Sequence, residues 1–318
     1  MNKNARHCRF ALQRTIITAL LFMAAITTNA QFIFRISGNG LEKPSYILGT
    51  LHVMSGNLLD SIPAYLEAES QCLQLFVETD TSAPQYRNDI KATSQQLITL
   101  PDGKTITDIL GEEKMNVLQE RMKKSCHVDL ADSAAQTILH YQPFFFAIML
   151  NSVIQMEALQ KYPAMRNGNM IDGACAKRAK DRGWKVGNLD QKLSSEELAK
   201  EKETLNQSID EQADSLMAFL NNFDERRQKI LKEFEGIQTL GDYWTAGDYE
   251  GFERLFLPEN EANPALYGER NKKWMPTIIE AMKEKPTLFV FGAGHLTGPD
   301  GVVQKLREAG YQVVNQSR

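Results

Sequence analysis

The sequence predicts an α/β fold, in which a central, mostly parallel sheet is built from βα units at the two ends of the chain and carries a large helical insertion. Two apolar runs typical of buried strands stand far apart, at residues 46–48 and 287–291, and each leads directly into a Gly-x-x-His motif. Between about residues 83 and 285 the pattern is mainly helical. Ligands bind outside the carboxyl ends of strands in open α/β sheets. We therefore expect the two strands to be neighbours, so that His52 and His295 face one cleft.

The N-terminal elements alternate between strand and helix, with apolar strands at residues 32–36, 45–48 and 73–77 and a helix at about 60–70. Residues 38–40 (Gly-Asn-Gly) predict the turn that makes the first two strands a hairpin. Pro63 falls in the first turn of the helix, where proline is tolerated. The strand that follows ends at Glu78. The second strand, the first histidine motif, the helix and the third strand make one βαβ unit, right-handed if the strands are parallel.

The middle of the chain is mainly helical, and strands return near its end. Helices are predicted at residues 112–124, 170–182, 194–238, 263–285 and 300–309, and short strands at 184–186 and 311–314. Residues 131–159 are apolar on nearly every side and predict a buried helix pair. Asn151, Gln155 and Glu157 interrupt this run, which argues against a membrane segment. Pro276 should break or kink the helix that contains it.

The first thirty residues have the features of a signal peptide. A basic segment without acidic residues precedes an apolar stretch at residues 15–27, which is short for a membrane span. Residues 28–30 (Thr-Asn-Ala) offer a small-residue cleavage site. We therefore expect Gln31 to begin an exported chain, periplasmic or secreted, that forms a single α/β domain over residues 31–318. An uncleaved N-terminal anchor is the alternative.

Charge and cysteine content narrow the class of protein. The formal net charge is −4 and no basic patch stands out, which argues against a nucleic-acid partner. After signal cleavage, no later stretch is long and apolar enough to span a bilayer. Cys72, Cys126 and Cys175 form no Cys-x-x-Cys pair, and we expect them to be mostly core residues. In an oxidising compartment, a disulfide between Cys126 and Cys175 is an alternative that the sequence does not exclude. The sequence leaves the oligomeric state undetermined.

Side chains suited to metal binding are predicted at the strand ends. Of the four histidines after the signal peptide, His52 and His295 lie in the Gly-x-x-His motifs. His127 falls in a polar turn and His140 in a helix, and both are expected to be structural or incidental. Glu78 ends the strand after the first motif, on the same sheet edge as His52. Two imidazoles and a carboxylate suit Zn²⁺, Mn²⁺ or Co²⁺ with open positions for water, and they would equally serve as a metal-free acid–base set.

The glycines of the two motifs have a physical reason to be there. Gly49, Gly292 and Gly294 lack a Cβ, so backbone and ligand can approach closely at the strand ends. The alternative to a site is a pair of hydrogen-bonded histidines beside two glycine turns. Glu78 would then be a helix cap or an ion-pair carboxylate.

Three further polar residues are weaker candidates. Arg270 lies in a predicted helix, and on its own it would be assigned to a solvated face. Asp172 begins a helix and could be its cap. Asp190 ends a strand and could hydrogen-bond the outer ring nitrogen of a histidine.

In order and spacing, these motifs resemble the TraB/GumN family in its exported bacterial form, over essentially the whole chain after the signal peptide. The segments that carry the resemblance are residues 45–52 (SYILGTLH), 76–80 (FVETD), 269–271 (ERN) and 291–301 (FGAGHLTGPDG), the last being the most specific. The family is similar to the Tiki metalloproteases and, more distantly, to the erythromycin esterases and the ChaN haem-binding proteins. Residues 168–190 resemble the family's G-x-D helix and following strand. That strand usually ends in Leu-Glu, so the shorter Asp190 departs from the pattern.

The resemblance implies a metal-dependent hydrolase, and we expect a peptidase that acts on a peptide or protein. His52, Glu78 and His295 would hold a divalent metal (Mn, Co or Zn). Arg270, followed by Asn271, would stabilise the oxyanion, and Glu78 could instead be the general base. Two alternatives stay open: a non-catalytic binding protein that sequesters a signal peptide, and a haem- or iron-binding protein.

Overall fold

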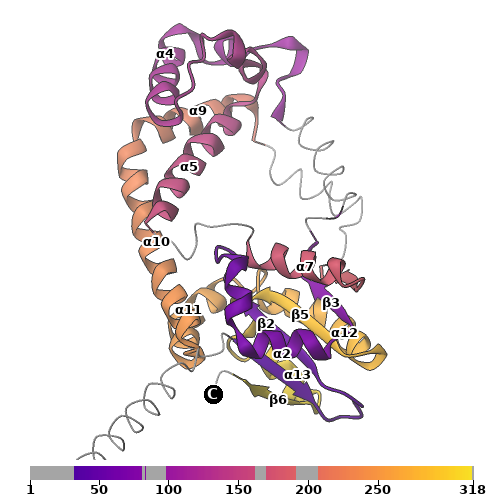
Figure 1. Ribbon diagram of the computed structural model, residues 1–318. Coiled ribbons are helices and arrows are strands. Elements are labelled where there is room, and N and C mark those ends of the chain that lie inside the picture. The colour runs from indigo at the N-terminus through magenta and orange to yellow at the C-terminus, as the bar shows by residue number, and fades with distance from the viewer. Residues whose placement is uncertain (1–31, 81–82, 84–97, 162–169, 191–206, 317–318) are drawn as a thin grey trace, which may run out of the picture.

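A mixed six-stranded sheet lies at the centre of the computed structural model, which describes residues 32–80, 83, 98–161, 170–190 and 207–316 (Figure 1). Its strands are β1 (Ile33–Ser37), β2 (Ser45–Thr50), β3 (Gln74–Val77), β4 (Lys185–Asn188), β5 (Thr287–Gly292) and β6 (Gln312–Asn315). Across the sheet their order is β4-β3-β5-β2-β1-β6. β1 is antiparallel to both of its neighbours, and the other pairs are parallel. The predicted α/β fold with a mostly parallel sheet is therefore confirmed.

The two strands that precede the histidine motifs are neighbours. β2 pairs with β5 in parallel, with Gly49 opposite Phe291 and Thr50 opposite Gly292. Every residue of both strands is buried, as expected for central strands covered on both faces. β5 also pairs with β3, so it lies between β2 and β3. The βαβ unit predicted at the N-terminus is therefore not made of adjacent strands, because the last parallel strand of the chain inserts between them.

Helices from both ends of the chain pack against the sheet. They are α2 (Pro63–Gln71), α7 (Ile171–Asp181), α12 (Gly268–Glu284) and α13 (Val302–Glu308). Their apolar side chains and the sheet form one hydrophobic core, which includes the buried Trp244 and Trp274. α12 continues through Pro276 as one helix, so of the predicted break or kink the break does not occur.

A second group of helices has a hydrophobic core of its own. α4 (Ile106–Cys126), α5 (Pro143–Gln160), α9 (Ile209–Asn221) and the first half of α10 (Phe223–Ala246) contribute to it. α10 runs from this group to the sheet (Figure 1). α5 buries one side only, because Ile148 and Met156 are 53% and 63% exposed, so the predicted burial on nearly every side is wrong. The helices predicted at 194–238 are α9 and part of α10 within the described residues, and both bury apolar side chains on one side.

Short helices and one longer helix complete the described part of the chain: η1 (Gly56–Ser61), η2 (Pro101–Gly103), η3 (Ser133–His140), η4 (Ala293–Leu296) and α11 (Tyr249–Ala262). Cys72, Cys126 and Cys175 are all free thiols, so the Cys126–Cys175 bridge is not formed. Among the described residues, no helix is both long and apolar enough to cross a membrane. The predicted signal peptide and its cleavage site lie outside the described residues.

Candidate functional site

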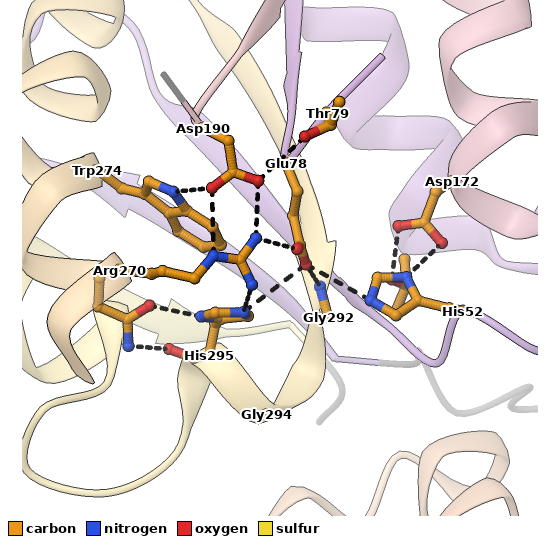
Figure 2. A network of polar contacts seen from close by, with 12 residues as sticks. His52, Glu78, Thr79, Asp172, Asp190, Arg270, Trp274, Gly292, Gly294 and His295 are labelled. Carbon is orange, nitrogen blue, oxygen red and sulfur yellow. Dashed lines mark hydrogen bonds and ion pairs between the residues drawn. The ribbon is translucent and has the colours of Figure 1, made fainter. Parts of the chain in front are cut away.

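Three neighbouring parallel strands end at one edge of the sheet, and each is followed by a candidate side chain. His52 comes after β2, Glu78 after β3, and His295 lies in η4 directly after β5. Glu78 stands between the two imidazole rings (Figure 2). Its Oε1 is 3.5 Å from His52 Nε2 and 3.8 Å from His295 Nε2. The parallel pairing of the strands thus brings together side chains from opposite ends of the sequence.

Asp172 and Thr50 fix the orientation of His52. Asp172 Oδ2 lies 3.0 Å from His52 Nδ1, and Asp172 Oδ1 accepts a hydrogen bond of 2.8 Å from the Thr50 hydroxyl. A carboxylate only accepts, so Nδ1 carries a proton and the ring turns Nε2 toward Glu78. The hydrogen bond to Asp172 raises the pKa of His52. Asp172 is not the predicted helix cap, because Met170 occupies the N-cap of α7 and the Asp172 carboxylate points away to the histidine.

Asn271 holds His295 in the matching tautomer. Asn271 Nδ2 donates to the backbone carbonyls of His295 at 3.2 Å and of Asp300 at 2.9 Å. Its Oδ1 is therefore left to accept from His295 Nδ1 at 2.7 Å, and Nε2 carries the lone pair. Burial, reinforced by the nearby Arg270 guanidinium, lowers the pKa of His295 to about 3, so the ring is neutral near pH 7. His295 thus presents an unprotonated Nε2 toward Glu78, and His52 turns its Nε2 to the same carboxylate.

Glu78 is fixed by two strong donors. Its Oε1 accepts the Gly292 backbone N–H at 2.7 Å, and its Oε2 accepts from Arg270 Nη2 at 2.8 Å. Arg270 also turns Nη1 toward His295 Nε2, at 3.3 Å. The Arg270 side chain is only 26% exposed, so it belongs to the site and not to a solvated helix face.

Asp190 binds Arg270 in a bidentate manner. Its Oδ1 and Oδ2 accept from Arg270 Nε at 3.2 Å and Nη2 at 2.7 Å, and they also accept from Trp274 Nε1 and the Thr79 hydroxyl. Burial opposes ionisation of Asp190, but the hydrogen bonds from Arg270 and Trp274 outweigh it and lower its pKa. The predicted contact of Asp190 with a histidine is wrong. β3 separates β4 from both histidine-bearing strands, so the acid after β4 meets the arginine instead.

All three motif glycines are positions of close approach. A Cβ on Gly292 would lie 3.0 Å from His52 Nε2 and 3.3 Å from Glu78 Oε1. A Cβ on Gly49 would overlap Leu296, and one on Gly294 would meet the ring of Phe256 at 2.5 Å. Gly292 therefore keeps space free at the polar cluster, while Gly49 and Gly294 keep space for packing.

The donor set has the chemistry of a divalent-metal site. Two imidazole Nε2 atoms and one carboxylate oxygen face one another, and each imidazole is tied through Nδ1 to a polar partner, as in protein metal sites. The positions as found do not yet enclose an ion: among the described residues, no three His, Cys, Asp or Glu side chains form a metal-binding group. The guanidinium of Arg270, which lies beside His295 Nε2, occupies part of the space that an ion would need.

A cavity of about 890 Å³ opens beside this cluster. His52, Glu78, Asp190 and Arg270 line one end of it, and α7 forms a wall. The cavity is large enough for several residues of a peptide.

Sequence reasoning missed three residues that organise the site: Thr50, Thr79 and Trp274. Thr50 lies inside the first motif, and its hydroxyl fixes Asp172. Trp274 comes four residues after Arg270 on α12, so the two stand on one helix face. That spacing was the signal available in the sequence. His127 ends α4 in a left-handed conformation and His140 hydrogen-bonds the Lys104 carbonyl, so neither reaches the site.

Comparison with known proteins gives a family and distant relatives. The family model described as the TraB/PrgY/gumN family matches residues 32–315. The chain is 23% identical over 313 residues to Metalloprotease TIKI2 of Xenopus tropicalis, covering 85% of this chain and 57% of that protein. It is 22% identical over 311 residues to Metalloprotease TIKI1 of Xenopus tropicalis, covering 86% and 60%. For Metalloprotease TIKI2 of Danio rerio the identity is 24% over 321 residues, covering 85% and 58%. The chain thus spans less than two thirds of each relative, and no solved structure matches it.

Proposed function

The chain belongs to the TraB/PrgY/gumN family, and from that premise we propose that it is a metal-dependent hydrolase and, more specifically, a peptidase. One observation carries the proposal: His52 Nε2, Glu78 Oε1 and His295 Nε2 face one another, and Nδ1 of each ring is held by a polar partner. The names of the distant relatives, all metalloproteases, support the same chemistry. His52, Glu78 and His295 would hold the ion, and their nitrogen and oxygen donors suit Mn, Co or Zn.

Each residue has a defined task in this proposal. When bound, a divalent ion supplies Lewis-acid polarisation of the scissile carbonyl and acidifies water. Asp172 and Asn271 hold the two imidazoles with Nε2 turned inward. Arg270 lies 2.8 Å from Glu78 through Nη2, so its guanidinium is placed to stabilise negative charge that develops on the carbonyl oxygen. Glu78 either binds the ion or takes a proton from the attacking water as general base.

The substrate, in this proposal, is a peptide or protein that the chain meets outside the cytoplasm. The basic and apolar N-terminal pattern supports export to the periplasm or the medium. N-terminal sequencing of the protein from its native host should give Gln31 as the first residue. A chain that still begins at Met1 or Asn2 would contradict the export proposal.

The central test combines metal content with peptide cleavage. The purified protein should contain a divalent metal and cleave members of a peptide library, and chelation should stop the cleavage. His52→Ala and His295→Ala should lose both properties, while His140→Gln, which changes an exposed histidine remote from the site, should keep both. Glu78→Gln separates its two roles: loss of metal marks a ligand, and retained metal without turnover marks a general base. A wild-type protein that binds no metal and cleaves nothing would refute the proposal.

A non-catalytic peptide-binding protein is the second candidate. It is supported by one observation: Arg270 already contacts His295 Nε2 and Glu78, so that a cation of the protein itself lies beside them without an ion. Tight binding of uncleaved peptide by metal-free protein would favour it. No contact among the described residues gives the haem-binding alternative comparable support.

A further inference from the structure

The wall of the 890 Å³ cavity is formed by one face of α7. Met170, at its N-cap, and Gly173, Ala176 and Lys177 from the helix line the cavity in sequence order. Asp172, which holds His52, precedes Gly173 directly, so this wall begins at the polar cluster. A substrate whose scissile bond lies at His52 would therefore place a neighbouring side chain against Gly173.

Nothing in the described part of the chain requires glycine at position 173. A Cβ built on it meets no atom of the described residues within 4 Å, and its backbone is not in the left-handed region. The contrast with Gly292 is clear, since a Cβ there would meet His52 Nε2 at 3.0 Å. Glycine weakens a helix relative to alanine. What the glycine provides at this position is open volume in the cavity, beside the site.

The chemistry of the cavity favours a neutral, apolar occupant. The lining includes apolar residues, with Val77 and Ala176 buried and Met170 61% exposed, and the flexible Met170 side chain can adapt to an apolar group. Charged groups in the lining are already partnered. Farther along α7 the ion pairs Lys177–Asp181 and Lys180–Asp80 both measure 2.6 Å.

An acidic side chain would be disfavoured at the end near the polar cluster. Three carboxylates, Glu78, Asp172 and Asp190, lie there against the single permanent cation of Arg270. A basic side chain would find these carboxylates engaged with Arg270, His52, Thr50, Thr79 and Trp274.

We propose that this cavity is a subsite for a large apolar side chain of a peptide substrate, adjacent to the scissile bond, and that Gly173 sets its depth. The inference rests on the proposed peptidase function and names a substrate class for it. It assigns no role in bond cleavage to Gly173, which determines specificity only.

The test uses internally quenched peptides that are identical except at one residue beside the scissile bond. That residue is Gly, Leu, Phe, Asp or Lys, and both flanking positions are scanned. At one of the two positions, wild-type kcat/KM should be about 10- to 100-fold higher for Leu and Phe than for Gly, with Asp lowest. Gly173→Leu should lose this preference while still cleaving the Gly peptide and holding metal. Gly173→Ala, which adds one methyl group, should be intermediate and keeps the test valid if the Leu variant does not fold.

Gly236→Leu is the matched control. Gly236 lies on the exposed side of α10 and does not line the cavity, and its Cβ would also meet no atom within 4 Å among the residues that the structure describes. This variant should keep the wild-type preference. Unchanged Leu and Phe preference in both Gly173 variants, or a wild-type preference for Asp or Lys, would overturn the subsite.

A binding measurement separates this inference from the proposed function. The same peptides, labelled with fluorescein, are titrated with metal-depleted protein and followed by anisotropy. If wild type cleaves nothing but binds the Leu peptide at least 10-fold more tightly than the Gly peptide, and Gly173→Leu abolishes the difference, the subsite stands and the peptidase proposal falls. Equal affinity for the Leu and Gly peptides would overturn the subsite itself.

Discussion

Gly292 and Gly49 come from the two histidine motifs, yet adding one methyl group to each should have opposite consequences. In Gly292→Ala the new Cβ would lie 3.0 Å from His52 Nε2 and 3.3 Å from Glu78 Oε1. The His52 side chain is 57% exposed and can swing outward, so the free energy of unfolding should change by less than about 1 kcal/mol. The displacement moves Nε2 away from Glu78, and ligand positions in metal sites tolerate only about 0.2 Å. Metal affinity should therefore fall at least about tenfold, which is about 1.4 kcal/mol.

In Gly49→Ala the new Cβ would overlap Leu296 and meet Ala293 Cα at 3.3 Å, in a part of the core where both neighbours are about 1% exposed. Such overpacking typically costs about 1–3 kcal/mol of stability. Urea unfolding of metal-free protein and a metal competition assay, applied to both variants, measure the two effects. Unchanged metal affinity in Gly292→Ala would refute the assignment of His52 and Glu78 as joint ligands. Wild-type stability in Gly49→Ala would show that Leu296 gives way.

Three further outcomes follow from the hydrogen bonds of the site. Asp172→Asn should lower the pKa of His52 in an NMR titration, because its charged partner is removed, and should weaken metal binding about 10- to 100-fold; an unchanged ring pKa would contradict this. Arg270→Ala should keep or raise metal affinity, because Nη1 no longer lies beside Nε2 of the second histidine, and cleavage should fall about 10²–10³-fold. Loss of metal in this variant would mean that Arg270 acts through the metal ligands and not on the substrate. The third outcome concerns pH. His295 has a pKa of about 3 in the folded chain, against 6.5 ordinarily, so between these pH values the unfolded chain binds a proton that the folded chain does not. The metal-free protein should therefore lose stability as the pH falls from 6.5 toward 3. At pH 5 the loss in free energy of unfolding should be about 2 kcal/mol. Urea unfolding at pH 7 and pH 5 measures it: His295→Gln should remove the loss, and His140→Gln should retain it.

The parts of the fold that depend on local pattern could be predicted from the sequence. Unbroken apolar runs identified β2 and β5 as central strands, and the shared Gly-x-x-His ending indicated that they meet. The convergence of His52 and His295 follows from that one pairing. Glu78 follows as well, because a third parallel strand must end at the same edge of the sheet.

What could not be predicted depends on the order of the strands. The position of β5 between β2 and β3 is set by packing between segments that are distant in sequence, so the local hydrophobic periodicity does not predict it. Asp172 and Asp190 were therefore assigned the wrong partners: α7 brings the first to His52, and the edge strand β4 brings the second to Arg270. Only the resemblance to the family pointed to Asn271 as a candidate residue, although its side chain determines the tautomer of His295.

The contacts of Arg270 explain why a shorter acid suits the end of β4. Asp190 accepts from Nε and Nη2 along one edge of the guanidinium, while Trp274 and Thr79 each donate to one of its oxygens, so the carboxylate is held from both sides. Nη1 is then the arm of the guanidinium turned into the site, toward His295. If His52, Glu78 and His295 held an ion, the contacts with Asp190 would keep Arg270 anchored beside these residues. In the proposed function, that is the position from which the guanidinium would stabilise charge on a substrate carbonyl.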